Sequence, residues 1–260
     1  KPIPLSLSLD YTLVSDYIWR GANFSEFPAE GREKLNHQVG AALELDLEEA
    51  GAVGFAWWGE WYQGNKSGRN PNRQDKYLQE VDYTVYYAYG FDDVGIDVEV
   101  GWIAYTFPAV GGESQTTYEV YGSFGIKDGL RFGLEDGVLN PTVTYYYDID
   151  LVEAGWLEIG VSHEFPVIEY VTVTPSLVFG IDNEYWDNAI GNTGHESTKL
   201  TTMLYTVEVG YDLSGALAMP EEYGSISLAG FVSFSDAIRA DRAIGLNDEF
   251  YGGMTVSYGW

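Results

Sequence analysis

Acidic side chains recur at every second position along several long segments of this chain, opposite apolar side chains. In residues 94–107, Ile96, Val98, Val100 and Trp102 alternate with Asp97, Glu99 and Gly101. A period of two places such acids together on one face of an extended strand. A face lined by carboxylates concentrates cations and repels anions. The chemistry that these residues predict is therefore electrostatic selection of solutes rather than a bond-making reaction.

The alternation predicts an acidic interior whose lining includes one arginine. The expected pore-lining residues are Asp10, Asp16, Arg20, Glu44, Asp46, Glu60, Asp82, Asp97, Glu99, Glu119, Asp148, Glu158, Glu208 and Asp212. If the interior is open, this lining favours cations. The alternative is that many of these acids pair with the few basic residues or solvate the wall. Loops, or the inward-facing Trp58 and Tyr86, would then occlude the passage.

The net charge of the chain is −27, from 13 Lys and Arg against 40 Asp and Glu. A nucleic-acid-binding protein needs a basic surface, and none is visible. The expected partners are instead small solutes or cations. Cysteine is absent, which excludes disulfides and thiolate metal sites. No motif for a cofactor is present, so we expect neither a cofactor nor a bound metal.

The spacing of the histidines argues against a hydrolase. The histidines are His37, His163 and His195, and His163 lies between Ser162 and Glu164. Because neighbours on a strand point to opposite faces, these three residues do not form a triad. We therefore expect no enzyme, with an Asp/His site near His195 as the open alternative. The oxygen-rich loop 182–196 matches no EF-hand spacing, so it is expected to be solvated rather than to bind calcium.

Twelve segments with alternating polarity predict the strands. They are 5–14, 35–47, 51–63, 78–91, 94–107, 115–126, 140–149, 155–165, 169–182, 199–213, 224–235 and 248–260. Soluble strands usually run about 5–6 residues, whereas a tilted membrane strand needs about 9–11. No apolar run approaches the roughly 18 residues of a transmembrane helix. The sequence predicts an all-β fold, a single transmembrane antiparallel up-and-down β-barrel of about twelve strands over residues 1–260.

The aromatic content and the connections are also typical of a membrane barrel. Aromatic residues form 16% of the chain, which is normal where aromatic belts lie at two membrane interfaces. The expected outer belt is Tyr17, Trp19, Trp61, Tyr62, Tyr105, Phe107, Trp156 and Phe250, and the inner belt is Tyr89, Phe91, Phe124, Phe165, Tyr170, Tyr211, Tyr258 and Trp260. Short and long connections alternate, which predicts a periplasmic N-terminus. The links 127–139 and 150–154 are exceptions to that alternation.

The C-terminal segment ends on an aromatic residue. Met254, Val256, Tyr258 and Trp260 alternate with small or polar residues. The pattern looks like the terminal-strand signal of the outer-membrane barrel assembly machinery, although Phe is the commoner last residue. The alternative is an edge strand that happens to end the chain. The expected location is the bacterial outer membrane, with outer-membrane lipid and the assembly machinery as partners.

Residues 15–21 read Ser-Asp-Tyr-Ile-Trp-Arg-Gly, directly after the first predicted strand. This segment resembles the SDYxxRG segment of the TorF-like outer-membrane proteins, a family of bacterial porin-like barrels. The resemblance implies location and barrel fold more than chemistry. By alternation, Asp16 and Arg20 face the lumen while Tyr17 and Trp19 face outward. Arg20 would pair with Asp16 or with a carboxylate across the wall, and so either narrow a pore or hold the first loop inward.

The sequence therefore predicts an outer-membrane, porin-like channel for passive diffusion of small solutes, with a preference for cations set by its acidic lumen. The alternative is a plugged barrel with a structural or surface-interaction role through its extracellular loops. No feature marks a subunit interface, so the oligomeric state stays open.

Overall fold

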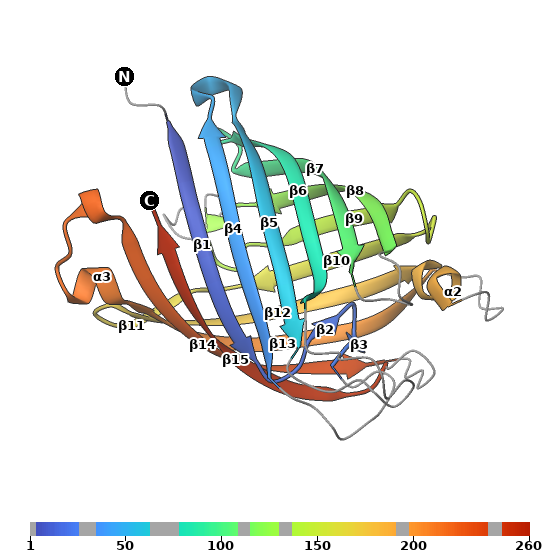
Figure 1. The fold of residues 1–260 in the computed structure, drawn as a ribbon. Coiled ribbons are helices and arrows are strands. Elements are labelled where there is room, and N and C mark those ends of the chain that lie inside the picture. The colour runs from blue at the N-terminus through green and yellow to red at the C-terminus, as the bar shows by residue number, and fades with distance from the viewer. Residues whose placement is uncertain are drawn as a thin grey trace.

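The chain folds into one closed antiparallel β-barrel (Figure 1). The computed structural model describes residues 4–25, 35–62, 78–108, 115–129, 137–190, 198–238 and 246–260. Within these residues the wall follows the order β1, β4, β5, β6, β7, β8, β9, β10, β12, β13, β14 and β15. The strands are β1 (Leu5–Val14), β4 (Asn36–Asp46), β5 (Ala52–Tyr62), β6 (Leu78–Phe91), β7 (Ile96–Phe107), β8 (Gln115–Ile126), β9 (Thr142–Asp148), β10 (Gly155–Ser162), β12 (Val171–Asn183), β13 (Thr198–Asp212), β14 (Ser225–Ala237) and β15 (Glu249–Gly259). The predicted twelve-stranded all-β barrel is confirmed.

Short elements lie at the ends of the barrel strands. They are β2 (Ile18–Trp19), β3 (Ala22–Asn23), β11 (Phe165–Ile168), α2 (Tyr185–Ile190), α3 (Leu213–Ala216), and the 3₁₀ turns η1 (Glu48–Ala50) and η2 (Glu221–Tyr223). The strand β11 pairs with β12. Among the residues described, no helix has the length and apolar character needed to cross a membrane.

The pairing of the first strand with the last closes the barrel. The backbone N–H groups of Leu7 and Trp260 each donate to the other residue's carbonyl, at 2.8 and 2.9 Å. The wall is also continuous past the short strand β11, because β10 pairs with β12 over seven residue pairs, from Trp156↔Asp182 to Ser162↔Ser176. Lipid offers no hydrogen-bond partner to a free sheet edge, so this closure is what allows the strands to lie in a bilayer.

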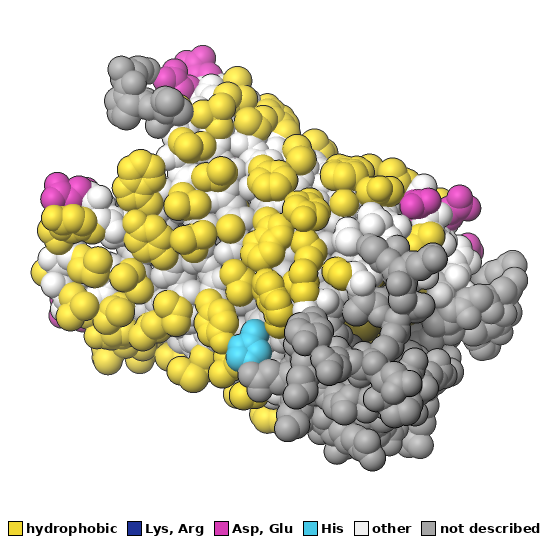
Figure 2. Space-filling model, viewed as in Figure 1, with side chains coloured by type: hydrophobic (Ala, Val, Ile, Leu, Met, Phe, Trp, Pro, Cys, Tyr) yellow, Lys and Arg dark blue, Asp and Glu magenta, His cyan; other side chains and the backbone are white. Residues whose placement is uncertain are grey.

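Apolar side chains cover the outer wall. Val85, Val100 and Val232 are 50%, 55% and 50% exposed, although each lies within a long strand. In Figure 2 apolar side chains spread over the visible wall, while carboxylates gather toward its ends. A water-soluble protein would bury such a surface, whereas hydrocarbon solvates it.

Short turns gather at one end of the barrel, where both termini lie (Figure 1). This end carries the short turns η1 and β6–β7, and also the longer β13–β14 link that contains α3 and η2. The two expected exceptions are present, because the β8–β9 link is long at this end and the β9–β10 link is short at the other.

Asp128 fixes the long β8–β9 link. Its carboxylate accepts hydrogen bonds from the backbone N–H groups of Val138, Leu139 and Asn140, at 2.7, 2.8 and 3.2 Å. Desolvation acts to raise the pKa of Asp128, but these donors outweigh it and hold the pKa below its ordinary value. An ionised Asp128 therefore holds the chain in place ahead of β9.

Two glycines on the inner wall make room for tyrosine rings from the next strand. A Cβ atom at Gly54 would overlap the Tyr86 ring, and one at Gly101 would overlap the Tyr121 ring. Each ring therefore lies along the wall over its neighbouring strand. The hydroxyl of Tyr86 donates to Glu44 at 2.8 Å. The hydroxyl of Tyr121 donates to Glu99 at 2.6 Å.

Replacing Gly101 by alanine should destabilise the barrel, because the new Cβ atom displaces the Tyr121 ring. Overpacking of this kind typically costs about 1–3 kcal/mol. Gly122→Ala on the neighbouring strand β8 is the matched control, since no atom lies within 4 Å of its added Cβ. Urea unfolding of the barrel in lipid vesicles measures the free energy of unfolding of both variants. Equal free energies of unfolding for the two variants would contradict the close packing.

Candidate functional site

The connection after β1 turns into the barrel and forms a two-stranded hairpin, which we call the lumen hairpin (residues 16–25). Its strands β2 and β3 pair antiparallel. The base is held by Ser25, whose Oγ accepts a hydrogen bond from the backbone N–H of Tyr17 at 2.7 Å. Asn36 at the start of β4 donates its side-chain amide to the same oxygen at 2.7 Å. These hydrogen bonds thus attach the base of the lumen hairpin to the barrel wall.

Arg20 and Gly21 form the tip of the lumen hairpin, with φ values of 50° and 81°. A tight two-residue turn of type I′ needs positive φ at both positions. Glycine adopts this conformation freely, but a non-glycine residue pays about 1–3 kcal/mol for it. A Cβ at Gly21 would also overlap Thr202 on β13. Contacts of the Arg20 side chain must therefore hold the strained tip in place.

Arg20 forms a buried, bidentate ion pair with Glu119 on β8. Its two terminal nitrogens lie 2.7 and 2.9 Å from the two carboxylate oxygens. The side chains are 3% and 0% exposed. The hydroxyl of Tyr105 on β7 donates to Glu119 at 3.0 Å. Two parallel hydrogen bonds fix both the distance and the orientation of the guanidinium group.

Aromatic rings surround the guanidinium group of Arg20. Its central carbon lies 4.3 Å from the ring centroid of Tyr185, 4.4 Å from Trp19, 5.2 Å from Tyr146 and 5.8 Å from Trp156. Cations are attracted to such ring faces, most strongly where water is excluded. Burial acts to lower the pKa of Arg20, but the Glu119 carboxylate outweighs it and raises the pKa above its ordinary value. The guanidinium group therefore stays charged.

The short helix α2 packs over the lumen hairpin. Asp182 at the end of β12 starts the helix by accepting a hydrogen bond from the backbone N–H of Tyr185 at 2.7 Å. The indole N–H of Trp186 donates to the backbone carbonyl of Arg20 at 3.3 Å. Tyr185 and Trp186 share a buried apolar cluster with Ala22 and Trp156. This cluster lies toward the barrel end opposite the termini.

Four aromatic residues expected in the outer belt lie inside the barrel instead, so that part of the prediction is wrong. Trp156 and Tyr105 are 1% and 7% exposed. Trp19 packs on Tyr105, and Tyr17 packs on Trp58 of β5, with ring centroids 6.0 and 5.5 Å apart. Tyr105 and Trp156 share the inward parity of the acids on their own strands. Tyr17 and Trp19 face inward because the chain leaves β1 before them.

The predicted lining residues are spread along the barrel rather than gathered at one point. Arg20 meets Glu119, not Asp16, whose carboxylate accepts a hydrogen bond from Asn23 at 3.2 Å. Glu60, Asp82, Asp148 and Glu158 belong to the hairpin end; Asp10 and Glu208 lie within their strands; and Glu44, Asp46, Asp97, Glu99 and Asp212 lie toward the end with the termini.

Several of these acids have structural partners in the wall. Asp148 is fully buried, and it accepts hydrogen bonds from the hydroxyl of Thr117 at 2.6 Å and from the backbone N–H of Val152 at 2.9 Å. Glu158 accepts one from the indole N–H of Trp156 at 3.0 Å. Asp148 thereby holds the β9–β10 link. Whether these acids line an open passage stays a prediction.

Three further residues, Glu80, Tyr185 and Trp186, complete the site and were not predicted from the sequence. Glu80 lies two positions before Asp82 on the same face of β6, and it is 6% exposed. The alternation alone indicates its inward direction. Tyr185 and Trp186 lie on a six-residue helix inside a loop that was expected to be solvated, and no periodic signal marks them.

Two hollows open on the inner wall. A cavity of about 460 Å³ near the termini is lined by acids including Asp46, Asp97 and Glu99. A second, of about 350 Å³, lies beside the lumen hairpin against β13, β14, β15 and the adjoining β1, β4 and β5. Asp16 and Tyr17 line the second cavity from the hairpin side.

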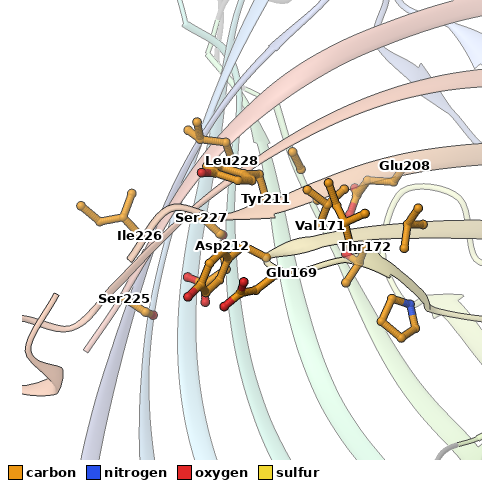
Figure 3. A pocket seen from close by; sticks show the side chains of 16 residues that line it. Glu169, Val171, Thr172, Glu208, Tyr211, Asp212, Ser225, Ile226, Ser227 and Leu228 are labelled. Carbon is orange, nitrogen blue, oxygen red and sulfur yellow. The ribbon is translucent and has the colours of Figure 1, made fainter. Parts of the chain in front are cut away.

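A third hollow, of about 750 Å³, lies at the ends of β11 to β14 (Figure 3). Its lining includes Glu169, Glu208 and Asp212 together with Ser225 and Ser227. Figure 3 shows these polar side chains beside the apolar Val171, Ile226 and Leu228. Acidic side chains therefore line part of the barrel opening at the end where the termini lie. In the part of the chain that the structure describes, no group of three or more His, Asp or Glu is placed to hold a metal ion.

The chain matches no known family profile and no curated protein. Among solved structures it is similar to the NanC porin, with a TM-score of 0.51 at 11% identity over 97% of this chain and 98% of that one. It aligns less well with the KdgM porin, with a TM-score of 0.45 at 10% identity over 98% of each chain. The same holds for outer membrane phospholipase A from Escherichia coli, with a TM-score of 0.45 at 14% identity over 97% of this chain and 92% of that one.

The similarity to the NanC porin shows the fold alone. No family profile supports the likeness of residues 15–21 to the TorF-like proteins, so no family is assigned. The chain has the fold of a twelve-stranded bacterial outer-membrane β-barrel.

Replacing Glu119 by alanine should lower the free energy of unfolding by about 3–5 kcal/mol, because it leaves the Arg20 guanidinium buried without its counter-charge. The double variant Arg20→Met/Glu119→Leu should recover much of that loss, since it removes both charges. Lys127→Ala is the matched control, because its ion pair with Asp97 is about half exposed and such pairs contribute about 0–1 kcal/mol. Urea unfolding in lipid vesicles compares the free energies of unfolding of these variants. A Glu119→Ala variant as stable as Lys127→Ala would contradict the buried pair.

Proposed function

We propose that this chain is an outer-membrane, porin-like channel for passive diffusion of small solutes, with a preference for cations. The barrel fold supports a transmembrane passage, since twelve strands enclose more space than the side-chain-filled interior of an eight-stranded barrel. The hollows on the inner wall support a passage for small solutes in particular. Small solutes or cations and the surrounding lipid are the partners that this proposal requires.

The charge of the inner wall is the observation that carries the cation preference. The described residues contain three basic side chains, Arg20, Lys127 and Lys199, among most of the 40 acids. Arg20 pairs with Glu119, Lys127 with Asp92 and Asp97, and Lys199 with Asp187. Each of these three basic groups is therefore compensated, and the remaining carboxylates of the described residues leave their part of the inner wall negative. A negative wall favours cations and disfavours anions.

Reversal potentials in planar bilayers test the preference. Under a salt gradient, the wild-type channel should show a cation-selective reversal potential. Glu44→Gln/Glu99→Gln removes two inner-wall charges and should move this potential toward zero. Glu221→Gln/Glu222→Gln removes two charges from the exposed turn η2 and is the matched control, which should shift it less. Anion selectivity, or no conductance from folded protein, would overturn the proposal.

A plugged barrel with a surface-interaction role is the second candidate, and the lumen hairpin favours it. The buried Arg20–Glu119 pair and the packing of α2 fill the hairpin end of the barrel. This candidate predicts a folded barrel without conductance and a binding partner for the extracellular loops.

We further propose that the chain is not an enzyme. Nδ1 of His37 contacts the hydroxyl of Tyr11 at 2.6 Å, and His163 packs against Phe165 with ring centroids 4.1 Å apart. The neighbours of His163 on its own segment, Ser162 and Glu164, alternate in direction along the chain and do not support a triad with it. His195 lies outside the described residues. A hydrolytic activity lost on His195→Ala would overturn this part.

The terminal strand is proposed as the segment that the barrel assembly machinery reads. Met254, Val256 and Trp260 are 71%, 46% and 62% exposed. Their outward direction on β15, together with that of Tyr258, supports recognition from the outside of the wall.

A further inference from the structure

We infer that the lumen hairpin is the constriction of the channel, and that the Arg20–Glu119 pair is what holds it across the lumen. Arg20 is then a positioning residue that sets the size limit for solutes. The inference rests on the proposed function, since it names the part of the channel that selects by size.

The lumen hairpin contacts opposite walls of the barrel. Tyr17 packs on Trp58 of β5. The tip reaches Glu119 on β8 through Arg20, and Gly21 lies against Thr202 on β13. In the strand order, β5 and β13 are separated by four strands on one side and six on the other. A segment that contacts both walls crosses the interior.

The lumen hairpin has contacts on both of its sides. Ala22 forms a β-bridge with Leu246, which is 2% exposed and lies just before β15. Trp19 packs edge-on against Tyr185 and Trp186 of α2, with ring centroids 5.6 and 5.8 Å apart. The side of the lumen bounded by β7 to β12 is therefore filled by side chains at this level.

The other side keeps an opening. The cavity of about 350 Å³ lies between the lumen hairpin and the wall formed by β13 to β15 and the adjoining β1, β4 and β5. Asp16 and Ile18 line it from the hairpin, and Glu208, Thr206 and Ser233 line it from the wall. Two carboxylates and two hydroxyls suit a small cation or a small polar solute. The position of the hairpin decides the width of this opening.

The tip is held to β8 by one bidentate ion pair. The turn carries the positive φ of Arg20, and the guanidinium group has its charge compensated by the carboxylate of Glu119. Without Arg20, the carboxylate of Glu119 would be buried with no counter-charge and would draw in water or a cation. The lumen hairpin would then lose its attachment to β8 and swing away from it.

Single-channel conductance in planar bilayers tests this. Arg20→Ala should raise the conductance several-fold and admit larger neutral sugars in a liposome-swelling assay. Lys127→Ala, which breaks an exposed ion pair at the mouth, is the matched control and should leave the size limit unchanged. Millimolar methylguanidinium chloride should restore the low conductance of Arg20→Ala by occupying the site of the lost side chain. It should leave the wild type unchanged.

A disulfide provides an independent measurement in a chain that has no cysteine of its own. A Cβ built on Gly21 lies 3.4 Å from the Cβ of Thr202, close to the spacing that a disulfide requires. In Arg20→Ala/Gly21→Cys/Thr202→Cys, oxidation should lock the hairpin and give low conductance, and reduction should give high conductance. Because both states belong to the same folded protein, a folding defect cannot produce the difference.

The outcomes separate this inference from the proposed function. A folded Arg20→Ala barrel with wild-type conductance and size limit would overturn the constriction, as would a cysteine variant indifferent to reduction. If the wild type showed no conductance but the reduced cysteine variant conducted, the constriction would be supported. The proposal that the wild-type channel is open would then be overturned. A cation-selective wild type with an unresponsive Arg20→Ala would leave the proposed function standing and the constriction refuted.

Discussion

The requirement that every backbone hydrogen bond be made inside the protein governs this structure. A strand edge exposed to hydrocarbon leaves a row of polar groups without partners, which lipid cannot supply. Pairing β1 with β15 joins the two edges of the sheet and so removes both. Closure then fixes the direction of every side chain, because successive residues on a strand alternate between lipid and interior. The apolar exterior and the acidic interior therefore both follow from the same continuous backbone pairing between strands.

Closure also creates an interior that the wall does not fill by itself. The tyrosines that lie over Gly54 and Gly101 stay against the wall and satisfy Glu44 and Glu99 without crossing the lumen. The hairpin end is filled differently, by a segment that leaves the wall. The lumen hairpin and α2 bring Trp19, Tyr185 and Trp186 together, and Arg20 joins them to Glu119. The two halves of the lumen thus differ in packing.

The strands were predictable because their signal is local and repeated. A period of two over ten or more residues is visible in the sequence, and the predicted boundaries agree with the structure to within a few residues. The same alternation places Tyr105 and Trp156 on the inward face of their strands. They were nevertheless predicted to lie in the outer aromatic belt, because only their position along the barrel axis was considered. The inward turn of Tyr17 and Trp19 carries no such signal, since it depends on contacts with β5, β7 and α2. Glu119 as the partner of Arg20 was equally hidden, because 99 residues separate them.

The choice of arginine at the hairpin tip follows from the geometry of its site. The site offers two carboxylate oxygens in one plane and ring faces on several sides. A planar guanidinium group meets both demands, donating two parallel hydrogen bonds while its faces lie on the rings. A lysine ammonium would present one compact, strongly hydrated charge and would lose more on leaving water. Ten of the 13 basic residues lie outside the described ranges, while Arg20 is buried in the barrel. Among the described residues, Arg20 is the one arginine, and its charge is matched to the single carboxylate of Glu119.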